Sequence, residues 1–209
     1  MNKLFHLFRK GLLFMFSKES EMSLATRIGS LEVEWGSMFS GKSDALITAV
    51  KRAMIANKKI QAFKPQIDNR YSDDTIVTHD GKEIPCVVVK DSYDLMSRID
   101  LNTEIVAIDE VQFFDDHIIE VINSLRRYGG TKVVVAGLDM WANGEPVELT
   151  SKLAAIAHKA TKHHAVCVDT GEEAYLSYCL VEKEGDVLVG GNDKYIALSE
   201  KAYLERMKK

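Results

Sequence analysis

The expected architecture of this chain follows from one octet, Gly36-Ser37-Met38-Phe39-Ser40-Gly41-Lys42-Ser43. Two glycines separated by four residues, then a lysine and a hydroxyl residue, form the pattern of a phosphate-binding loop (P-loop). In such a loop the backbone N–H groups surround phosphate oxygens, the lysine reaches the β- and γ-phosphates, and the hydroxyl binds Mg²⁺. The flanks fit, because residues 31–35 predict a strand and residues 44–57 predict an amphipathic helix. The pattern therefore predicts bound ATP and Mg²⁺, and the alternative is a chance glycine turn.

The composition is that of a soluble globular protein. The chain has 209 residues, of which 46% are hydrophobic and 28% charged, enough for one domain or one domain with a small appendage. A net charge of −4 argues against a general nucleic-acid or membrane binder. Cys86, Cys167 and Cys179 are far apart and form no C-x-x-C pair, which predicts neither a disulfide framework nor a cysteine metal site. A reducing cytoplasm is the expected compartment.

The first residues differ from the rest of the chain. Residues 1–16 are apolar and basic, and Arg9 and Lys10 interrupt them, so no uncharged run could span a bilayer. This segment is either an amphipathic surface anchor or an extension ahead of a start at Met22. We favour the second reading, because the P-loop strand begins shortly after Met22. Residues 1–28 are thus expected to be a disordered extension or to precede the true start.

Apolar segments alternate with helical patterns through most of the remaining chain. This alternation predicts an α/β fold, a mostly parallel sheet with helices on both faces. Strands are expected at 31–35, 59–63, 86–89, 105–108 and 132–136, and helices at 44–57, 93–99, 115–128 and 150–162. From residue 165 the pattern changes to short extended pieces and glycine turns, ending in a helix from residue 199. We expect a P-loop nucleotide-binding domain at 29–164 and a small C-terminal domain at 165–209.

A second nucleotide-binding pattern follows the predicted strand 105–108, which ends in Asp109 and Glu110. An apolar strand that ends in an acid, downstream of a P-loop, predicts that Asp109 holds Mg²⁺ opposite Ser43. Glu110 is then placed to take a proton from an attacking hydroxyl or water as a general base. The alternative is a strand ending in two exposed acids. Spacing alone does not separate an ATPase from a kinase.

Five collinear motifs together resemble the cellular-type (type II) thymidine kinase family. They are the P-loop, Lys64-Pro65 with Asp68 to Tyr71, Asp109-Glu110-Val111-Gln112-Phe113-Phe114, Gly137-Leu138-Asp139-Met140, and Gly190-Gly191 with Asp193-Lys194-Tyr195. The resemblance runs from about residue 29 to the end. It implies a RecA-like ATP-binding domain and a small domain with a lasso loop. It also implies a homotetramer that moves the γ-phosphoryl group of ATP to the 5′-hydroxyl of thymidine or deoxyuridine.

The resemblance also implies a role for individual residues. Glu110 would be the catalytic base, and Ser43 and Asp109 would serve Mg²⁺. Arg70 would steady the transferred charge and Tyr195 would reach the sugar. The residues implied in ATP binding are Gly36, Ser37, Met38, Phe39, Ser40, Gly41, Lys42, Ser43, Asp68, Asn69, Arg70, Asp109 and Gln112. Those implied in nucleoside binding are Met38, Phe113, Leu138, Trp141, Ala142, Val187, Leu188, Val189, Gly190 and Tyr195.

The sequence departs from the family pattern at its zinc ligands. Family members usually carry four cysteines there. Here Cys167 occupies the first position, and Thr170, Ser199 and Ala202 occupy the other three. One thiolate does not build a tetrahedral zinc site, so we predict that zinc is absent.

A second departure lies in the base pocket, where Ala142 stands in place of the aromatic residue that packs on the base. Trp141 lies one position earlier, and the sequence leaves open whether its ring enters the pocket.

Three functions remain open at this point. The first is a thymidine kinase. The second is a deoxynucleoside kinase of different base preference, suggested by Trp141-Ala142-Asn143. The third is a non-catalytic nucleotide-binding regulator, suggested by the missing cysteines. The presence of both Lys42 and Glu110 favours an enzyme, which binds a small nucleoside and neither nucleic acid nor membrane.

Overall fold

A parallel six-stranded sheet forms the centre of the computed structural model, which describes residues 28–68, 75–77, 81–181, 190–191 and 193–208. The strand order is β5-β2-β6-β7-β1-β8, and every neighbouring pair is parallel. The strands are β1 (Leu31–Gly36), β2 (Ile60–Pro65), β5 (Val87–Val89), β6 (Ile105–Ile108), β7 (Lys132–Leu138) and β8 (Lys159–His163). The carboxyl ends of parallel strands share one edge, so the segments after β1, β2, β6 and β7 meet there.

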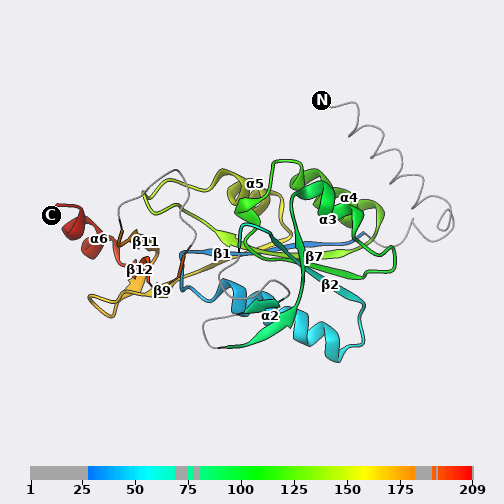
Figure 1. The fold of residues 1–209 in the computed structure, drawn as a ribbon, viewed down its shortest axis with the longest axis horizontal. Coiled ribbons are helices and arrows are strands. Elements are labelled where there is room, and N and C mark those ends of the chain that lie inside the picture. Colours follow the sequence, from blue (N-terminus) through cyan, green and yellow to red (C-terminus); the bar gives the residue numbers. More distant parts are fainter. Residues whose placement is uncertain (1–27, 69–74, 78–80, 182–189, 192, 209) are drawn as a thin grey trace.

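Helices cover both faces of the sheet (Figure 1). Helix α2 (Lys42–Ile55) lies on one face, and α3 (Ser92–Ser97), α4 (Ile118–Tyr128) and α5 (Glu148–Ile156) lie on the other. Along β7 the side chains alternate, because Val133 and Val135 pack with α4 and α5 while Ala136 packs with α2. The central strands β6 and β7 are largely buried on both faces, which explains why they are nearly continuous apolar runs. The predicted α/β fold class is confirmed.

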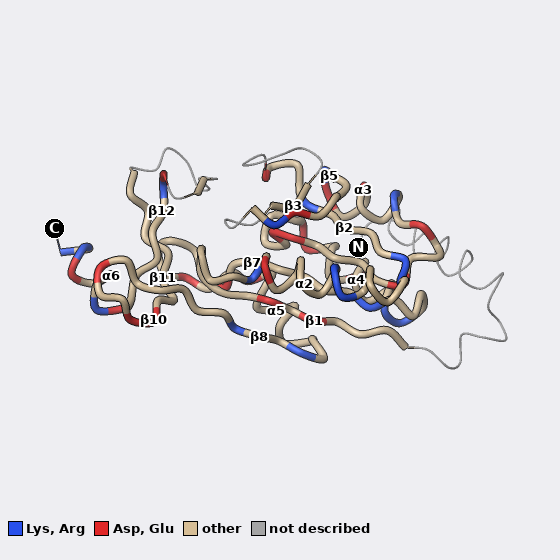
Figure 2. Tube along the Cα trace, turned by 90° about the horizontal axis from the view of Figure 1, so that it is seen from below, with Lys and Arg blue, Asp and Glu red and all other residues tan. Residues whose placement is uncertain are grey.

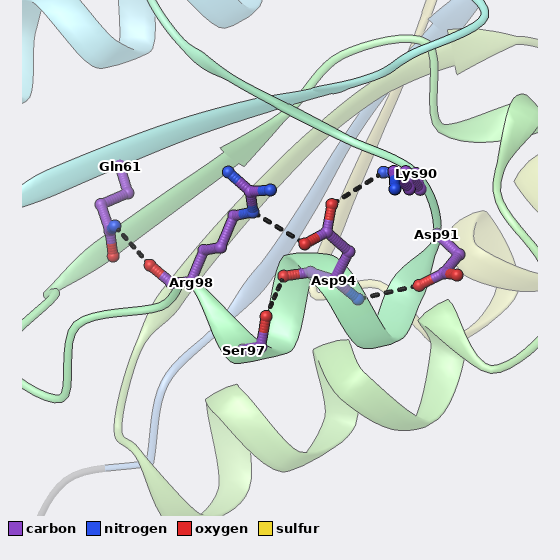
Figure 3. A network of polar contacts seen from close by, with 6 residues as sticks. All are labelled: Gln61, Lys90, Asp91, Asp94, Ser97 and Arg98. Carbon is purple, nitrogen blue, oxygen red and sulfur yellow. Dashed lines mark hydrogen bonds and ion pairs between the residues drawn. The ribbon is translucent and has the colours of Figure 1, made fainter.

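Most helix boundaries lie within a few residues of the predicted ones, and α3 shows how polar side chains set them (Figure 3). The Asp91 carboxylate accepts a hydrogen bond from the Asp94 amide at 2.8 Å and caps the helix. The Asp94 carboxylate accepts from Arg98 Nε at 2.7 Å and from the Lys90 amide at 3.0 Å. These contacts lower the pKa of Asp94, that with Arg98 most strongly. Gln61 donates to the Arg98 carbonyl and fastens the end of α3 to β2.

The predicted helix at 150–162 is wrong over its second half. Helix α5 ends at Ile156, and residues 159–163 form β8. Strand β8 pairs in parallel with the otherwise open side of β1, so tertiary pairing outweighs the helical pattern. His163 and Lys159 then face Glu34, while Lys162 faces the other way, toward Asp139. Basic positions on β8 therefore lie beside β1 (Figure 2).

The C-terminal elements lie together at one end of the molecule (Figures 1 and 2). They are β9 (Ala165–Val166), β10 (Glu173–Ala174), β11 (Leu176–Cys179), β12 (Tyr195–Leu198) and α6 (Glu200–Met207). Their small buried cluster contains Cys167, Leu198 and Tyr203, and Phe39 of the P-loop packs against it. A further hairpin, β3 (Thr75–Val77) with β4 (Glu83–Pro85), packs on α2 through Ile76 and Ile84.

Some predictions fall on residues outside the described ranges. They concern the extension at 1–27, Asn69, Arg70, and the lasso residues Val187, Leu188 and Val189. The division of the chain at residue 165 stays a prediction. Within the described ranges, each helix is too short or too polar to cross a bilayer.

Candidate nucleotide and nucleoside site

The P-loop connects β1 to α2, and its backbone has close contacts and positive φ angles that favour glycine. Gly36 lies so close to the edge strand that a Cβ atom there would be 2.3 Å from the His163 carbonyl oxygen. Gly41, which precedes α2, has φ of 84°, a conformation that favours glycine. Phe39 also has a positive φ, 64°, and packs against the C-terminal cluster. The loop is therefore held in shape by contacts on both sides.

Two buried hydroxyl groups of this loop fit a ligand that accepts hydrogen bonds. The Oγ atoms of Ser37 and Ser40 are inaccessible to solvent and have no hydrogen-bond partner among the described residues. Buried polar groups are normally paired, so unpaired donors here fit a ligand rich in acceptor oxygens. The Lys42 side chain is also buried, and its ammonium group contacts the Ser37 carbonyl at 3.4 Å. These residues fit the phosphate groups of ATP.

A cluster of acidic groups lies opposite the loop, after β2 and β6. The Ser43 hydroxyl donates to Asp109 Oδ1 at 3.1 Å, which joins the two sequence motifs directly. Asp109, Glu110 and Asp68 are each at most 7% exposed. Burial, then the charges of Glu110 and Asp68, raise the pKa of Asp109 to about 7, and Lys42 acts in the opposite direction. A divalent cation between Ser43 and Asp109 would relieve this excess negative charge, so the residues fit Mg²⁺.

Glu110 is oriented by the short 3₁₀ helix that follows it, η1 (Val111–Phe113). It has a positive φ of 49°, which turns the chain sharply at the end of β6. Gln112 Nε2 donates to Glu110 Oε2, and Gln112 Oε1 accepts from the Leu138 amide at 3.1 Å. Because both ends of the Gln112 amide are engaged, the Glu110 carboxylate is fixed relative to β7. Gln112 is positioned to orient the predicted base.

Residues predicted for the base pocket gather near the ends of β1 and β7. Leu138 lies beside Gly36 in the register of these strands, at the start of the P-loop that carries Met38. The rings of Phe113 and Trp141 are 6.4 Å apart at 46°. Trp141 therefore lies against a residue that the resemblance assigns to the pocket, whereas Ala142 contributes its carbonyl oxygen to a contact with α6.

Tyr195 belongs instead to the C-terminal hairpin, where β12 pairs with β11, and Gly190 precedes β12 in the sequence. Tyr195 pairs with Cys179 in this hairpin, and burial, then Cys179, raise the pKa of Tyr195 to about 12. The same hairpin contacts the P-loop, because the buried Ser177 hydroxyl accepts from the Met38 amide at 3.0 Å. Ser177 was not predicted, and no local pattern marks a contact between residues 139 positions apart.

The four positions that the resemblance assigns to zinc ligands do come together, and Cys167 is the one zinc-binding side chain among the four. Cys167 and Ala202 lie in the same buried cluster. Burial alone would raise the pKa of the Cys167 thiol, but hydrogen bonds from Thr170 and the Ser199 backbone lower it to about 7. A thiol, two hydroxyls and a methyl group do not match tetrahedral zinc. The described residues hold no group of three or more His, Cys, Asp and Glu side chains able to bind a metal.

Fold and site together define a class, the P-loop nucleotide-binding α/β proteins. The sequence model described as thymidine kinase matches residues 29–203, so the chain belongs to the thymidine kinase family.

Curated relatives carry the name of the same family. A thymidine kinase of Bacteroides thetaiotaomicron is 40% identical over 189 residues, covering 89% of this chain and 92% of that protein. A thymidine kinase of Bacteroides fragilis strain YCH46 is 39% identical over 188 residues, with 88% and 92% covered. Among solved structures, the large terminase of a thermophilic bacteriophage has a TM-score of 0.40 and 17% identity, with 78% of this chain and 46% of that chain covered. A likeness this low carries no argument.

Proposed function

We propose that this protein transfers the γ-phosphoryl group of ATP to the 5′-hydroxyl of thymidine or deoxyuridine, which serves nucleotide salvage for DNA synthesis. The observation that carries the proposal is the buried arrangement in which Ser43 contacts Asp109 while Gln112 orients Glu110. Membership of the thymidine kinase family and the names of the curated relatives support the choice of substrate.

Each residue has a distinct task in this reaction. The P-loop amides, with Ser37, Ser40 and Lys42, bind the phosphate oxygens. Ser43 and Asp109 would hold Mg²⁺, which would supply positive charge to balance the β- and γ-phosphates. Glu110 accepts the proton of the 5′-hydroxyl as that oxygen bonds to the γ-phosphorus, and the bond to the β–γ bridging oxygen breaks to release ADP. Arg70 and Asp68 complete the phosphate-transfer site.

The base is recognised by the other group of residues. Met38, Phe113, Leu138 and Trp141 form apolar walls, and the backbone of 187–190 binds the edge of the thymine. Trp141 supplies the aromatic surface that Ala142 lacks, because its ring lies beside Phe113. The second candidate function is a deoxynucleoside kinase with a different base preference. If the Trp141 ring packed away from the pocket, a nucleoside other than thymidine would be the better substrate.

A phosphoryl-transfer assay with ATP and Mg²⁺ against a panel of nucleosides tests the proposal. Thymidine and deoxyuridine are expected to give the highest kcat/KM. Turnover that is highest with another nucleoside would favour the second candidate, and ATP binding without phosphorylation of any nucleoside would favour a regulator. We further propose a homotetramer that lies in the cytoplasm and binds neither nucleic acid nor membrane. Sedimentation would test the tetramer.

A further inference from the structure

We propose that Tyr203 of α6 is a positioning residue for the nucleoside pocket, because its hydroxyl holds the loop of residues 141–145 against Phe113. The inference rests on the proposed function for its substrate, and it adds a specificity determinant from outside the pocket. Tyr203 would act through the loop rather than by touching the nucleoside.

The contact is partly buried and joins distant parts of the sequence. The Tyr203 hydroxyl donates to the Ala142 carbonyl oxygen at 2.8 Å, across 61 positions of sequence. Tyr203 is 8% exposed, and its ring packs edge-on against Tyr178 with centroids 5.8 Å apart. Burial, then Tyr178, raise the pKa of Tyr203 above its usual value, so the hydroxyl stays protonated and remains a donor at neutral pH. A phenol fixed by ring packing is a rigid donor for one carbonyl.

The loop that receives this hydrogen bond is stiff within itself. The Trp141 amide donates to the Glu145 carbonyl at 2.8 Å, and the Gly144 amide donates back to the Trp141 carbonyl at 2.9 Å. Gly144 supplies the positive φ, 82°, that the turn requires. Such a loop moves as a unit, so one outside hydrogen bond at Ala142 also sets the position of the neighbouring Trp141 ring.

Helix α6 is itself anchored by contacts that need no metal. Arg206 donates to both carboxylate oxygens of Asp169, at 2.8 and 2.7 Å, and this two-point geometry fixes orientation as well as distance. The Arg206 guanidinium also lies over the Tyr178 ring at 5.7 Å. Ala202 and Tyr203 face the buried cluster. The helix is therefore a firm support from which Tyr203 reaches the loop.

A fluorescence measurement tests the positioning role without any substrate. The chain has two tryptophans, so in a Trp35→Phe background Trp141 is the sole reporter. Tyr203→Phe removes only the hydroxyl, and we expect acrylamide quenching of Trp141 to rise about twofold as the loop opens locally. Tyr178→Phe, the matched control, removes a neighbouring hydroxyl and should leave quenching unchanged. Unchanged quenching in Tyr203→Phe, equal changes in both variants, or loss of cooperative folding would each overturn the inference.

A kinetic measurement tests the consequence for the substrate. Tyr203→Phe should raise the thymidine KM about three- to tenfold, while kcat and the ATP KM stay within about twofold. In a Trp141→Ala background the same change should add nothing to KM, because the ring to be positioned is gone. Additive effects would mean that Tyr203 acts by another route and would overturn the inference. If the unsubstituted chain does not phosphorylate thymidine, the proposed function fails, and the quenching experiment still decides the role of Tyr203.

Discussion

Replacing Glu110 by glutamine should separate chemistry from geometry in this site. The amide has the shape of the carboxylate, and its oxygen still accepts the hydrogen bond that Gln112 Nε2 donates to Glu110. What is lost is the ability to take a proton from the 5′-hydroxyl. General-base loss costs about 10²–10⁴-fold in rate, which corresponds to about 3–5.5 kcal/mol of transition-state stabilisation. We therefore expect kcat to fall by this factor while the ATP KM stays within about twofold.

The electrostatics of the cluster add a second readout to the same variant. The charge of Glu110 contributes to the raised pKa of Asp109, so its removal should raise the melting temperature of the nucleotide-free protein at neutral pH. Glu148→Gln is the matched control, because the Glu148 side chain is 81% exposed and pairs with Lys152 at the surface. The assay is steady-state kinetics together with thermal melting of both variants. A Glu110→Gln enzyme that keeps more than half of its turnover would refute the assignment of Glu110 as the base.

Three further predictions concern the pocket, the metal and the acidic cluster. Trp141→Ala should raise the thymidine KM about tenfold, or about 1.4 kcal/mol, with Ala142→Phe restoring part of it, and a lower melting temperature at unchanged KM would contradict this. The purified protein should carry no stoichiometric zinc, because Cys167 is the single thiol of the expected set, and elemental analysis that found one zinc per chain would prove this wrong. The pKa of Asp109 is raised from 3.8 to about 7, so the folded state holds a proton that the unfolded chain releases, and stability should fall as pH rises through this window. Asp109→Asn should flatten that dependence in thermal melts while abolishing activity, and an unchanged pH profile would show that Asp109 titrates normally.

The parts of the site that could be predicted from the sequence are those whose residues lie close together in the chain. The P-loop needs its glycines, lysine and serine in one octet, and Asp109 follows directly from the apolar run of β6. The contact between Ser43 and Asp109 could be anticipated, because the carboxyl ends of parallel strands lie at one edge of the sheet. Local chemistry and the general rules of parallel sheets were sufficient here.

What sequence reasoning missed depends on contacts between distant segments. Residues 157–162 continue a helical pattern, but β1 had an open side, and pairing with β8 satisfied its backbone groups. Ser177 and Tyr203 are ordinary residues in their own segments, and only the fold brings them to Met38 and Ala142. A single sequence contains no local signal for such pairs.

The hydrogen bond between Ser177 and Met38 means that the P-loop of a truncated protein would depend on the C-terminal segment. A fragment that stops after His164 loses the hydroxyl that accepts from the Met38 amide and the apolar cluster that covers Phe39. The Met38 amide would then lack its hydrogen-bond acceptor. The ring of Phe39, a residue with a positive φ, would lose the cluster that covers it. The shorter piece would include every residue of the phosphate-binding octet and still lack part of what keeps the octet in shape. Chimeras should likewise exchange residues 165–209 together with the P-loop that they support.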